Sequence, residues 1–310
     1  MRPSRPRPLR ARGRITGSVA RPAILWGPLD SGRGWRPRRS LRRTFLSDPN
    51  ARGQNVVVRS RLKQPVKRLF RTLGFDIMRH YEPGLTVETH LRALLPMLEV
   101  DCVLDVGGYW GEFGTRLRDS GYSGRIVSFE PVAANVERLT KVAARDHDWQ
   151  VRRAALGRAM GRLQLNVTSG TQFSSFRQPL AAVLSEMPGA AVERREEVAV
   201  YRLDEVIADC LPRPDSRVFL KLDTQGWDLE VLAGASDCLD RVVCLQSEIS
   251  VRPIYEGMPR YLEALAAMEG LGFEPTGFFP VARDRRLRLV ELDCVMTRSD
   301  AAKPRESPSS

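Results

Sequence analysis

The stretch Val103–Gly114 reads VLDVGGYWGEFG and decides the fold class. A short apolar strand, Cys102–Val106, runs straight into a glycine-rich turn, and a helix follows. Glycine lets the backbone adopt positive φ and lets a ligand approach without a Cβ in the way, and the first turn of a helix leaves N–H groups unpaired. The pattern therefore predicts a ligand-binding loop between a buried strand and a helix. Its candidate binding residues are Asp105, Gly107, Gly108 and Gly111.

Nucleotide loops of the two common kinds are excluded. The pattern G-x-G-x-x-G is not satisfied in any frame around Gly107, and no Gly-Lys pair occurs in the chain, which excludes a P-loop. A second acid, Glu130, ends the next predicted strand, Arg125–Phe129, and lies 19 residues beyond Gly111. In doubly wound folds a carboxylate at this strand end binds the ribose hydroxyls of a nucleoside. Two acids without a phosphate-binding lysine favour a cationic nucleoside, and S-adenosylmethionine fits that description.

Strand-like and helix-like segments alternate from about residue 85 onward. This alternation predicts an α/β fold in which a mainly parallel, doubly wound sheet carries helices on both faces. The chain ends in two extended runs, Phe273–Val281 and Leu287–Thr297, which predict an antiparallel hairpin. The other predicted strands are Trp149–Ala155, Leu163–Val167, Val198–Leu203, Val218–Leu222 and Val242–Ile249. The predicted helices are Leu91–Val100, Glu112–Ser120, Ala133–Ala144, Leu203–Cys210, Leu229–Leu232 and Arg260–Leu271.

Six blocks of sequence resemble, in order and spacing, the FkbM family of methyltransferases. They are Asp105–Gly108, Ser128–Pro131, Ala155–Gly157, Phe173–Ser175, Lys221–Gly226 and Leu232–Ala235, within roughly residues 65–298. The resemblance implies the class I methyltransferase fold, a Rossmann-like sheet of seven strands that is mostly parallel and ends in an antiparallel hairpin. It also implies S-adenosyl-L-methionine as cofactor and, for most members, O-methylation of hydroxyls of sugars, glycolipids or polyketides.

The expected cofactor-binding residues lie at the ends of three strands. They are Asp105, Gly107, Gly108, Gly111, Glu130, Pro131, Ala155 and Leu156. The chain departs from the family's pattern at two places. Gly108-Tyr109 stands where the family usually has Ala-Asn, and Arg158 stands where an acid often follows Ala-Leu-Gly. We expect adenine to contact the backbone of Ala155 and Leu156 instead, and cofactor binding to survive because both strand-end acids are retained.

Methyl transfer to a hydroxyl requires alignment with the sulfonium and a base for the departing proton. Asp223, at the end of the predicted strand Val218–Leu222, is the best-placed catalytic base. Glu248, at the end of the next strand, is the second candidate. For either acid the alternative is a carboxylate that only caps the following helix. The candidate substrate-binding residues are Ser174, Ser175 and Gln225, and for the two serines a solvated loop is the alternative.

The net charge of +12 belongs to the start of the chain. Residues 1–72 hold 20 Lys and Arg against two acids, whereas the remainder holds 29 basic and 35 acidic residues, a charge of −6. The composition of residues 1–55 predicts a disordered basic tail, and residues 56–84 predict a lead-in helix and linker. The methyltransferase domain then spans 85–298, and 299–310 is a second disordered tail. We favour a solvated extension, which includes the case of sequence upstream of the true start. A transit peptide and an arm for nucleic acid or anionic lipid are the alternatives.

Cysteine and histidine usage predicts neither a disulfide framework nor a metal site. The five cysteines are scattered without a Cys-x-x-Cys pair, mostly beside apolar runs as buried thiols are, and the three histidines are dispersed. No apolar run approaches the roughly 20 residues of a transmembrane helix. We therefore expect a cytoplasmic enzyme.

Three functions are compatible with these motifs. We favour an S-adenosylmethionine-dependent O-methyltransferase that acts on a small-molecule or glycan hydroxyl. A nucleic-acid methyltransferase is suggested by the basic tail, but the −6 charge of the remainder and the lack of an Asn-Pro-Pro-aromatic element argue against it, so no nucleic-acid partner is expected. A non-catalytic S-adenosylmethionine-binding module is suggested by Tyr109 and Arg158. The identity of the acceptor, O- versus N-methylation and the oligomeric state stay open.

Overall fold

A computed structural model of the chain describes residues 84–299. The chain divides into two units, Met1–Gln64 and Pro65–Ser310, and every described residue belongs to the second unit. Outside the described residues lie the predicted N-terminal tail 1–55, the lead-in helix within 56–84 and the C-terminal tail from residue 300 onward. The domain boundaries drawn from the sequence therefore stay predictions.

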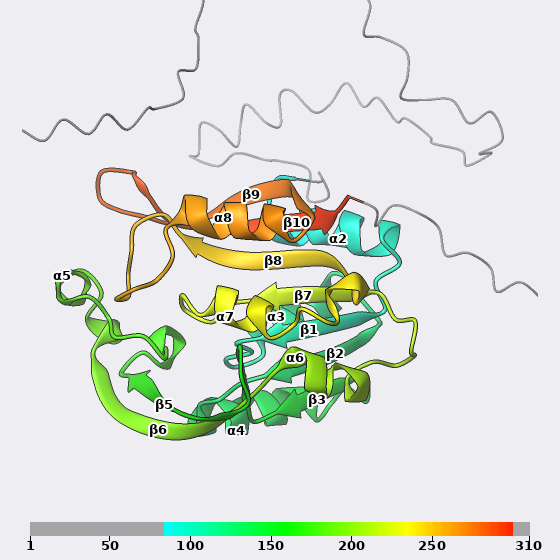
Figure 1. Cartoon of the computed structure of the whole chain (residues 1–310), viewed down its shortest axis with the longest axis horizontal. Helices are drawn as coiled ribbons and strands as arrows, with labels where there is room; N and C mark the ends of the chain where they lie inside the picture. The colour runs from blue at the N-terminus through cyan, green and yellow to red at the C-terminus, as the bar shows by residue number, and fades with distance from the viewer. Residues whose placement is uncertain (1–83, 300–310) are drawn as a thin grey trace, which may run out of the picture. The chain divides into compact units, whose positions relative to one another are not determined.

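Seven strands form the central sheet in the order β3-β2-β1-β7-β8-β10-β9 (Figure 1). They are β1 (Cys102–Val106), β2 (Arg125–Phe129), β3 (Trp149–Arg152), β7 (Val218–Leu222), β8 (Val242–Ser250), β9 (Phe273–Arg283) and β10 (Leu289–Arg298). The first five strands in this order pair in parallel, and β10 runs antiparallel to both β8 and β9. The predicted mostly parallel sheet with a C-terminal antiparallel hairpin is confirmed.

Helices cover both faces of this sheet, as the alternation predicted. One face packs against α2 (Val87–Met97), α3 (Glu112–Asp119) and α4 (Ala133–Ala143). The other packs against α6 (Leu203–Val206), α7 (Asp228–Ala233) and α8 (Tyr261–Gly270). Two cores form because successive side chains of a strand point to opposite faces. In β1, for example, Val103 joins the core under α2 to α4, and Leu104 joins the other.

A second, three-stranded sheet lies beyond the carboxyl ends of the main strands. Its order is β4 (Ala155–Leu156), β6 (Val192–Tyr201) and β5 (Gly161–Thr168), and β5 and β6 lie at the lower left in Figure 1. The prediction of one continuous strand over Trp149–Ala155 is wrong. The chain bends at Ala154, whose N–H donates to the carbonyl of Arg152 at 3.0 Å. Residues 155–156 then pair with β6 instead of continuing along β2.

The connection between β5 and β6 contains three short helices. It contains two 3-10 helices, η1 (Thr171–Phe173) and η2 (Pro188–Ala190), and α5 (Ala181–Leu184). Isolated β-bridges join Asn166 to Ser175 and Pro179 to Tyr255. These bridges hold the segment that follows η1 in a defined place over the sheet.

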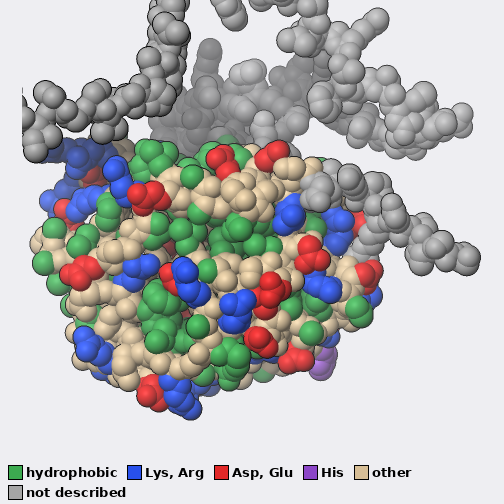
Figure 2. Space-filling model, viewed as in Figure 1, with side chains coloured by type: hydrophobic (Ala, Val, Ile, Leu, Met, Phe, Trp, Pro, Cys, Tyr) green, Lys and Arg blue, Asp and Glu red, His purple; other side chains and the backbone are tan. Residues whose placement is uncertain are grey.

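The remaining sequence predictions hold with small shifts. The predicted helix Leu203–Cys210 is divided into α6 and the 3-10 helix η3 (Ile207–Asp209), and a further 3-10 helix, η4 (Leu239–Arg241), precedes β8. All five cysteines are free and buried, as predicted. Within residues 84–299, none of the helices has the length and apolarity that crossing a bilayer requires. On the face drawn in Figure 2, acidic and basic side chains are interspersed.

Candidate functional site

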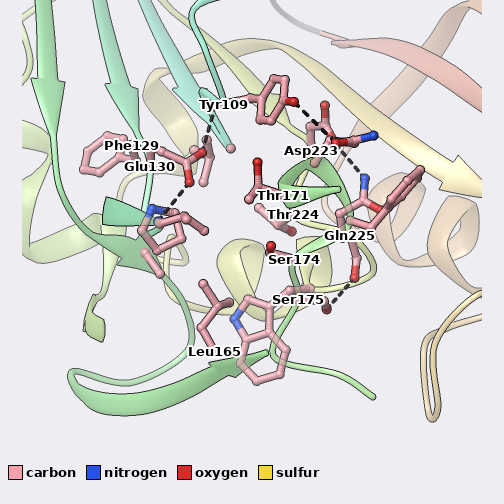
Figure 3. Close-up of a pocket in the computed structure, with 18 of the residues that line it drawn as sticks. Tyr109, Phe129, Glu130, Leu165, Thr171, Ser174, Ser175, Asp223, Thr224 and Gln225 are labelled. Carbon is pink, nitrogen blue, oxygen red and sulfur yellow. Dashed lines mark hydrogen bonds between the residues drawn. The ribbon is translucent and has the colours of Figure 1, made fainter. Parts of the chain in front are cut away.

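A cavity of about 520 Å³ opens at the carboxyl ends of β1, β2, β7 and β8, next to the second sheet. This volume lies within the range of small-molecule sites. The lining residues include Gly107, Tyr109, Glu130, Pro131, Ala155, Leu156, Thr171, Ser174, Ser175, Asp223, Gln225, Glu248 and Glu291. Figure 3 shows Glu130 and Asp223 on opposite sides of the cavity, with Thr171 and Ser174 between them. The structure therefore brings most of the predicted site residues together.

Three of the predicted cofactor-binding residues, Asp105, Gly108 and Gly111, do not line this cavity. The two glycines face the protein interior. A Cβ at Gly108 would lie 2.9 Å from the Cβ of Ser128, and a Cβ at Gly111 would lie 2.9 Å from Cδ1 of Leu139. These glycines let the loop pack closely against β2 and α4, and they act on the site through that packing.

Gly107 is the loop glycine that reaches the cavity. Its φ of +87° lies in the left-handed region, and a Cβ there would lie 2.0 Å from the backbone oxygen of Asp223. Its N–H donates to the carbonyl of Phe129 at 2.9 Å. Only glycine fits here, because the ends of β1, β2 and β7 converge on this one residue.

Asp105 is fully buried beneath the loop, where it pairs with Lys221. The hydroxyl of Ser128 donates to Oδ2 of Asp105 at 2.8 Å, and Nζ of Lys221 lies 3.1 Å from Oδ1. The same Nζ lies 3.3 Å from Oδ2 of Asp223 and donates to the carbonyl of Gly107 at 3.1 Å. Burial alone lowers the pKa of Lys221, but the charges of Asp223 and Asp105 outweigh it and raise the pKa above its ordinary value. Lys221 is therefore a buried cation that holds the two strand-end acids in place.

Replacing Lys221 by Met tests this ion-pair arrangement. We expect the free energy of unfolding to fall by about 3–5 kcal/mol, because the buried carboxylate of Asp105 loses its cation. Urea unfolding measures the change. The matched control is Lys141→Met on the exposed side of α4, for which we expect a change below about 0.5 kcal/mol. A Lys221→Met variant as stable as this control would contradict the assigned role.

Glu130 lies at the end of β2, on the other side of the cavity from Asp223. Its Oε2 accepts a hydrogen bond from the N–H of Tyr109 at 2.8 Å, and its Oε1 accepts from the N–H of Val132 at 2.9 Å and from Nδ2 of Asn135 at 3.2 Å. Burial raises the pKa of Glu130 to about 7, although these three hydrogen bonds act in the opposite direction. The carboxylate is thus held in one orientation at the cavity wall.

Asn135 lies behind the cavity wall and supports two lining residues, a role that the sequence analysis missed. It is buried on α4, and its Oδ1 accepts from the hydroxyl of Thr171 at 2.9 Å and from Nε1 of Trp110 at 3.1 Å. Since its Nδ2 donates to Glu130, Asn135 connects that carboxylate to the cavity-lining helix η1. The only signal in the sequence was a polar residue on the buried side of a predicted helix, which by itself does not identify a site.

Asp223, Gln225 and Glu248 meet at the other end of the cavity, where Figure 3 labels Asp223 and Gln225. Nε2 of Gln225 donates to Oδ1 of Asp223 at 3.1 Å and to Oε2 of Glu248 at 3.0 Å. The hydroxyl of Tyr255 donates to Oε1 of Gln225 at 2.8 Å, and the hydroxyl of Ser175 donates to the carbonyl of Gln225 at 2.8 Å. The φ of Gln225 is +53°, a conformation that side-chain-bearing residues adopt only when their surroundings enforce it. The Gln225 amide therefore joins both predicted catalytic acids.

The two acids differ in their surroundings. Burial raises the pKa of Glu248 well above its ordinary value, and the charges of Asp223, Glu291 and Asp293 raise it further. Asp223, by contrast, has the ammonium of Lys221 in contact. Neither acid caps a helix: α7, which follows Asp223, has no side-chain cap, and β8 continues to Ser250, beyond Glu248. The structure therefore does not support the alternative that these carboxylates only cap helices.

The two departures from the expected sequence pattern have different places in the structure. Arg158 does not line the cavity, and its Nε pairs with Oε2 of Glu230 at 2.8 Å. Tyr109 does line it, with its ring stacked on Trp110 at a centroid distance of 4.5 Å and its hydroxyl 3.3 Å from Oε1 of Gln172. The Tyr109 aromatic ring thus forms part of the cavity wall.

The remaining predicted residues line the wall between these two ends. Pro131, Ala155 and Leu156 form its apolar part beside Glu130. Ser174 and Ser175 line it from the segment that follows η1. The hydroxyl of Ser174 accepts a hydrogen bond from the N–H of Thr168 at 3.3 Å. Both serines are held by the protein rather than lying in a solvated loop.

A family model decides the assignment. The model of the Methyltransferase FkbM domain matches residues 105–275, more than half of the chain. The chain belongs to the FkbM methyltransferase family. FkbM methyltransferases use S-adenosylmethionine, which is the cofactor of this chain, and its sheet is that of a class I methyltransferase. No curated protein matches the chain.

Several solved structures are similar to this FkbM methyltransferase. Fibrillarin of Aeropyrum pernix with natively bound S-adenosyl-L-methionine has 14% identity and a TM-score of 0.39, over 70% of this chain and 75% of fibrillarin. Magnesium protoporphyrin IX methyltransferase of Synechocystis with bound cofactor has 10% identity and a TM-score of 0.37, over 76% and 92% of the two chains. An rRNA methylase of Streptococcus thermophilus has 9% identity and a TM-score of 0.38, over 69% and 98%. The family assignment rests on the domain model alone.

Proposed function

We propose that this FkbM methyltransferase methylates a hydroxyl oxygen of a small molecule or glycan, with Asp223 as the base. One observation carries the proposal. A single cavity has a fixed carboxylate, Glu130, at one end and the bridged acids Asp223 and Glu248 at the other. Sugars, glycolipids and polyketide-type compounds offer hydroxyls of the required kind.

The residues around the first end fit an adenosyl cofactor. The Glu130 carboxylate is a strong acceptor for the two ribose hydroxyls. Pro131, Ala155 and Leu156 provide an apolar wall for adenine beside it. Among the described residues, no Lys, Arg or His side chain lines the cavity, which suits a ligand without phosphates. Gly107 lines the cavity between the two ends and lets the end of β1 pack against the backbone of Asp223.

The residues at the second end fit the transfer step. S-Adenosylmethionine, when bound, supplies a methyl group whose bond to sulfur breaks as its bond to the acceptor oxygen forms. Asp223 accepts the proton of the acceptor hydroxyl as that oxygen becomes bonded to carbon. Gln225 orients the Asp223 carboxylate, and Lys221 holds it from behind. Glu248 binds a neighbouring group of the acceptor, and it is the alternative base.

Two measurements test the proposal. Titration calorimetry with S-adenosylhomocysteine tests the cofactor end, and we expect one molecule to bind per chain while NAD does not bind. Transfer of a labelled methyl group to a panel of sugars and hydroxylated polyketides tests the acceptor end, and we expect the label on oxygen. Cofactor binding without transfer to any hydroxyl, or transfer only to nitrogen or to RNA, would contradict the proposed reaction.

The affinity for S-adenosylhomocysteine should depend on pH through Glu130. The pKa of Glu130, about 7, lies above its ordinary value, so the folded chain holds this proton to higher pH than the unfolded chain does. The contribution of Glu130 to stability therefore decreases as the pH rises from its ordinary pKa to about 7. Ribose hydroxyls donate to the ionised form. We therefore expect affinity to rise about tenfold between roughly pH 6 and pH 8. Calorimetry at several pH values measures this rise, and a Glu130→Gln variant that retained the same pH dependence would contradict its origin in Glu130.

A further inference from the structure

Acidic side chains line the cavity at both ends. Glu130 lies at the cofactor end, and Asp223 and Glu248 lie at the acceptor end. Glu112 and Glu291 also line the cavity, and no Lys, Arg or His among the described residues does. The outer face drawn in Figure 2, by contrast, mixes both signs. An anionic acceptor is therefore disfavoured throughout the cavity.

Glu291 is the acid on which this inference rests. It lies on β10 and is only 8% exposed, yet it lines the cavity. Its Oε1 accepts from the hydroxyl of Ser250 at 3.2 Å, and among the described residues its Oε2 accepts no hydrogen bond. Oε2 is not one of the fully buried polar atoms without a partner, so it is open to the cavity, where a bound ligand can donate to it.

The strand register places Glu291 beside Glu248. In the antiparallel pair of β8 and β10, Glu291 is opposite Ser250 and Asp293 is opposite Glu248. Residues directly opposite in such a pair share one face of the sheet. Three carboxylates therefore lie together on this face, next to Asp223 at the end of the neighbouring strand β7.

Two cations act on this group of acids. Lys221 contacts Asp223 and is already shared with Asp105, and the charge of Arg116 partly offsets the rise that burial causes in the pKa of Asp293. Oδ1 of Asp293 is occupied by Nε2 of Gln246, a neutral amide, at 3.0 Å. Burial, together with the mutual repulsion of these acids, raises the pKa of Glu248, Glu291 and Asp293. A bound cation would relieve the repulsion.

The position of Glu291 separates it from the cofactor end. Glu130 follows β2, Gly107 follows β1 and Asp223 follows β7, which are consecutive strands of the sheet. Glu291 lies two strands beyond β7, on the far side of the proposed base. Within residues 84–299, no group of three or more His, Cys, Asp or Glu side chains is arranged to hold a metal ion. A protonated amine on the acceptor would bring a positive charge to these acids.

The geometry points to an acceptor that carries a protonated amine near the methylated hydroxyl, bound by Glu248 and Glu291. This inference rests on the proposed function, because it places the acceptor at the Asp223 end of the cavity. The chemical class is an amino alcohol, of which amino sugars are the compact example. An ammonium donates up to three hydrogen bonds, enough to reach both carboxylates. The selectivity then comes from charge, since a hydroxyl in the same place brings no positive charge to the acids.

Three probes of one shape test the inference. The chain is loaded with S-adenosylhomocysteine and titrated by ligand-observed NMR with D-glucosamine, D-glucose and D-glucuronate, which are cationic, neutral and anionic, at a pH where the amine is protonated. We expect glucosamine to bind at least about tenfold more tightly than glucose, and glucuronate to bind most weakly. In Glu291→Gln we expect the preference for glucosamine over glucose to fall to about threefold or less, with the affinity for S-adenosylhomocysteine unchanged. The matched control is Glu269→Gln on the exposed side of α8, which should retain the full preference.

The outcomes separate this inference from the proposed function. A chain that does not load S-adenosylhomocysteine contradicts both. A loaded chain that binds glucosamine and glucose equally, binds neither, or prefers glucuronate overturns the amine site alone. A Glu291→Gln variant that loses affinity for S-adenosylhomocysteine instead would assign the acid to the cofactor's own ammonium, which also overturns it.

Discussion

Asp223→Asn lowers kcat for methyl transfer by about 100-fold or more, and leaves the affinity for S-adenosylhomocysteine within about threefold. Asparagine keeps the shape of the side chain and an oxygen for the hydrogen bond from Gln225, but it does not accept the proton of the acceptor hydroxyl. The loss should therefore appear in kcat, with little change in cofactor binding. Steady-state kinetics of S-adenosylhomocysteine release, with the acceptor identified in the hydroxyl panel, measure the effect.

Glu248→Gln is the variant to compare with Asp223→Asn, because the two together show which acid is the base. Gln225 bonds to both acids, so both variants disturb the same amide. If Asp223 is the base, Glu248→Gln should mainly raise KM for the acceptor, and the exposed control Asp240→Asn should change neither constant by more than about twofold. An Asp223→Asn enzyme with undiminished kcat, beside a Glu248→Gln enzyme that has lost it, would move the base to Glu248.

Glu130→Ala should weaken the binding of S-adenosylhomocysteine by about 100-fold or more. Two hydrogen bonds from ribose hydroxyls to a carboxylate are lost, and hydrogen bonds to charged groups are each worth about 1.5–3 kcal/mol. The substitution also leaves the N–H groups of Tyr109 and Val132 without their acceptor, at a cost of about 1–3 kcal/mol each. We therefore expect a lower melting temperature even without ligand. Calorimetry below that temperature measures the affinity of the folded variant.

The control for Glu130 lies on the helix that follows it. Glu137 is exposed on α4, and Glu137→Gln should leave both the melting temperature and the affinity unchanged. Asn135→Ala tests the support of the carboxylate, since it removes one of its three donors and its link to Thr171. We expect an intermediate loss of affinity of about tenfold. Full affinity in Glu130→Ala would show that ribose is bound elsewhere.

The fold could be predicted because the short apolar runs in the sequence agree with the alternation of strand-like and helix-like segments along the chain. β1, β2 and β7 have the predicted bounds because each is a short apolar run buried along its length and set off by turn residues. The strand Trp149–Ala155 was wrong because the chain bends at Arg153 and Ala154, and residues 155–156 join another sheet. A pattern of apolar residues does not say which sheet a strand joins.

In the candidate site, the residues that lie at the ends of strands could be predicted from the sequence, and the others less so. Glu130, Asp223 and Glu248 line one cavity because parallel strands end at the same edge of a sheet. Asp105 was expected to contact the ligand. It lies instead beneath the loop, where it forms a buried ion pair with Lys221. Glu291 lines the cavity from β10, far along the chain from the strand-end acids, and no motif in its local sequence marks it as a cavity residue.

The most direct test of the account is a crystal structure of the chain with S-adenosylhomocysteine. We expect the ribose hydroxyls within hydrogen-bond distance of the Glu130 carboxylate, and the sulfur facing Asp223 across the cavity. A ligand whose ribose contacts neither oxygen of Glu130, or whose sulfur points away from Asp223, would contradict the central claim that this cavity aligns a methyl donor with that carboxylate.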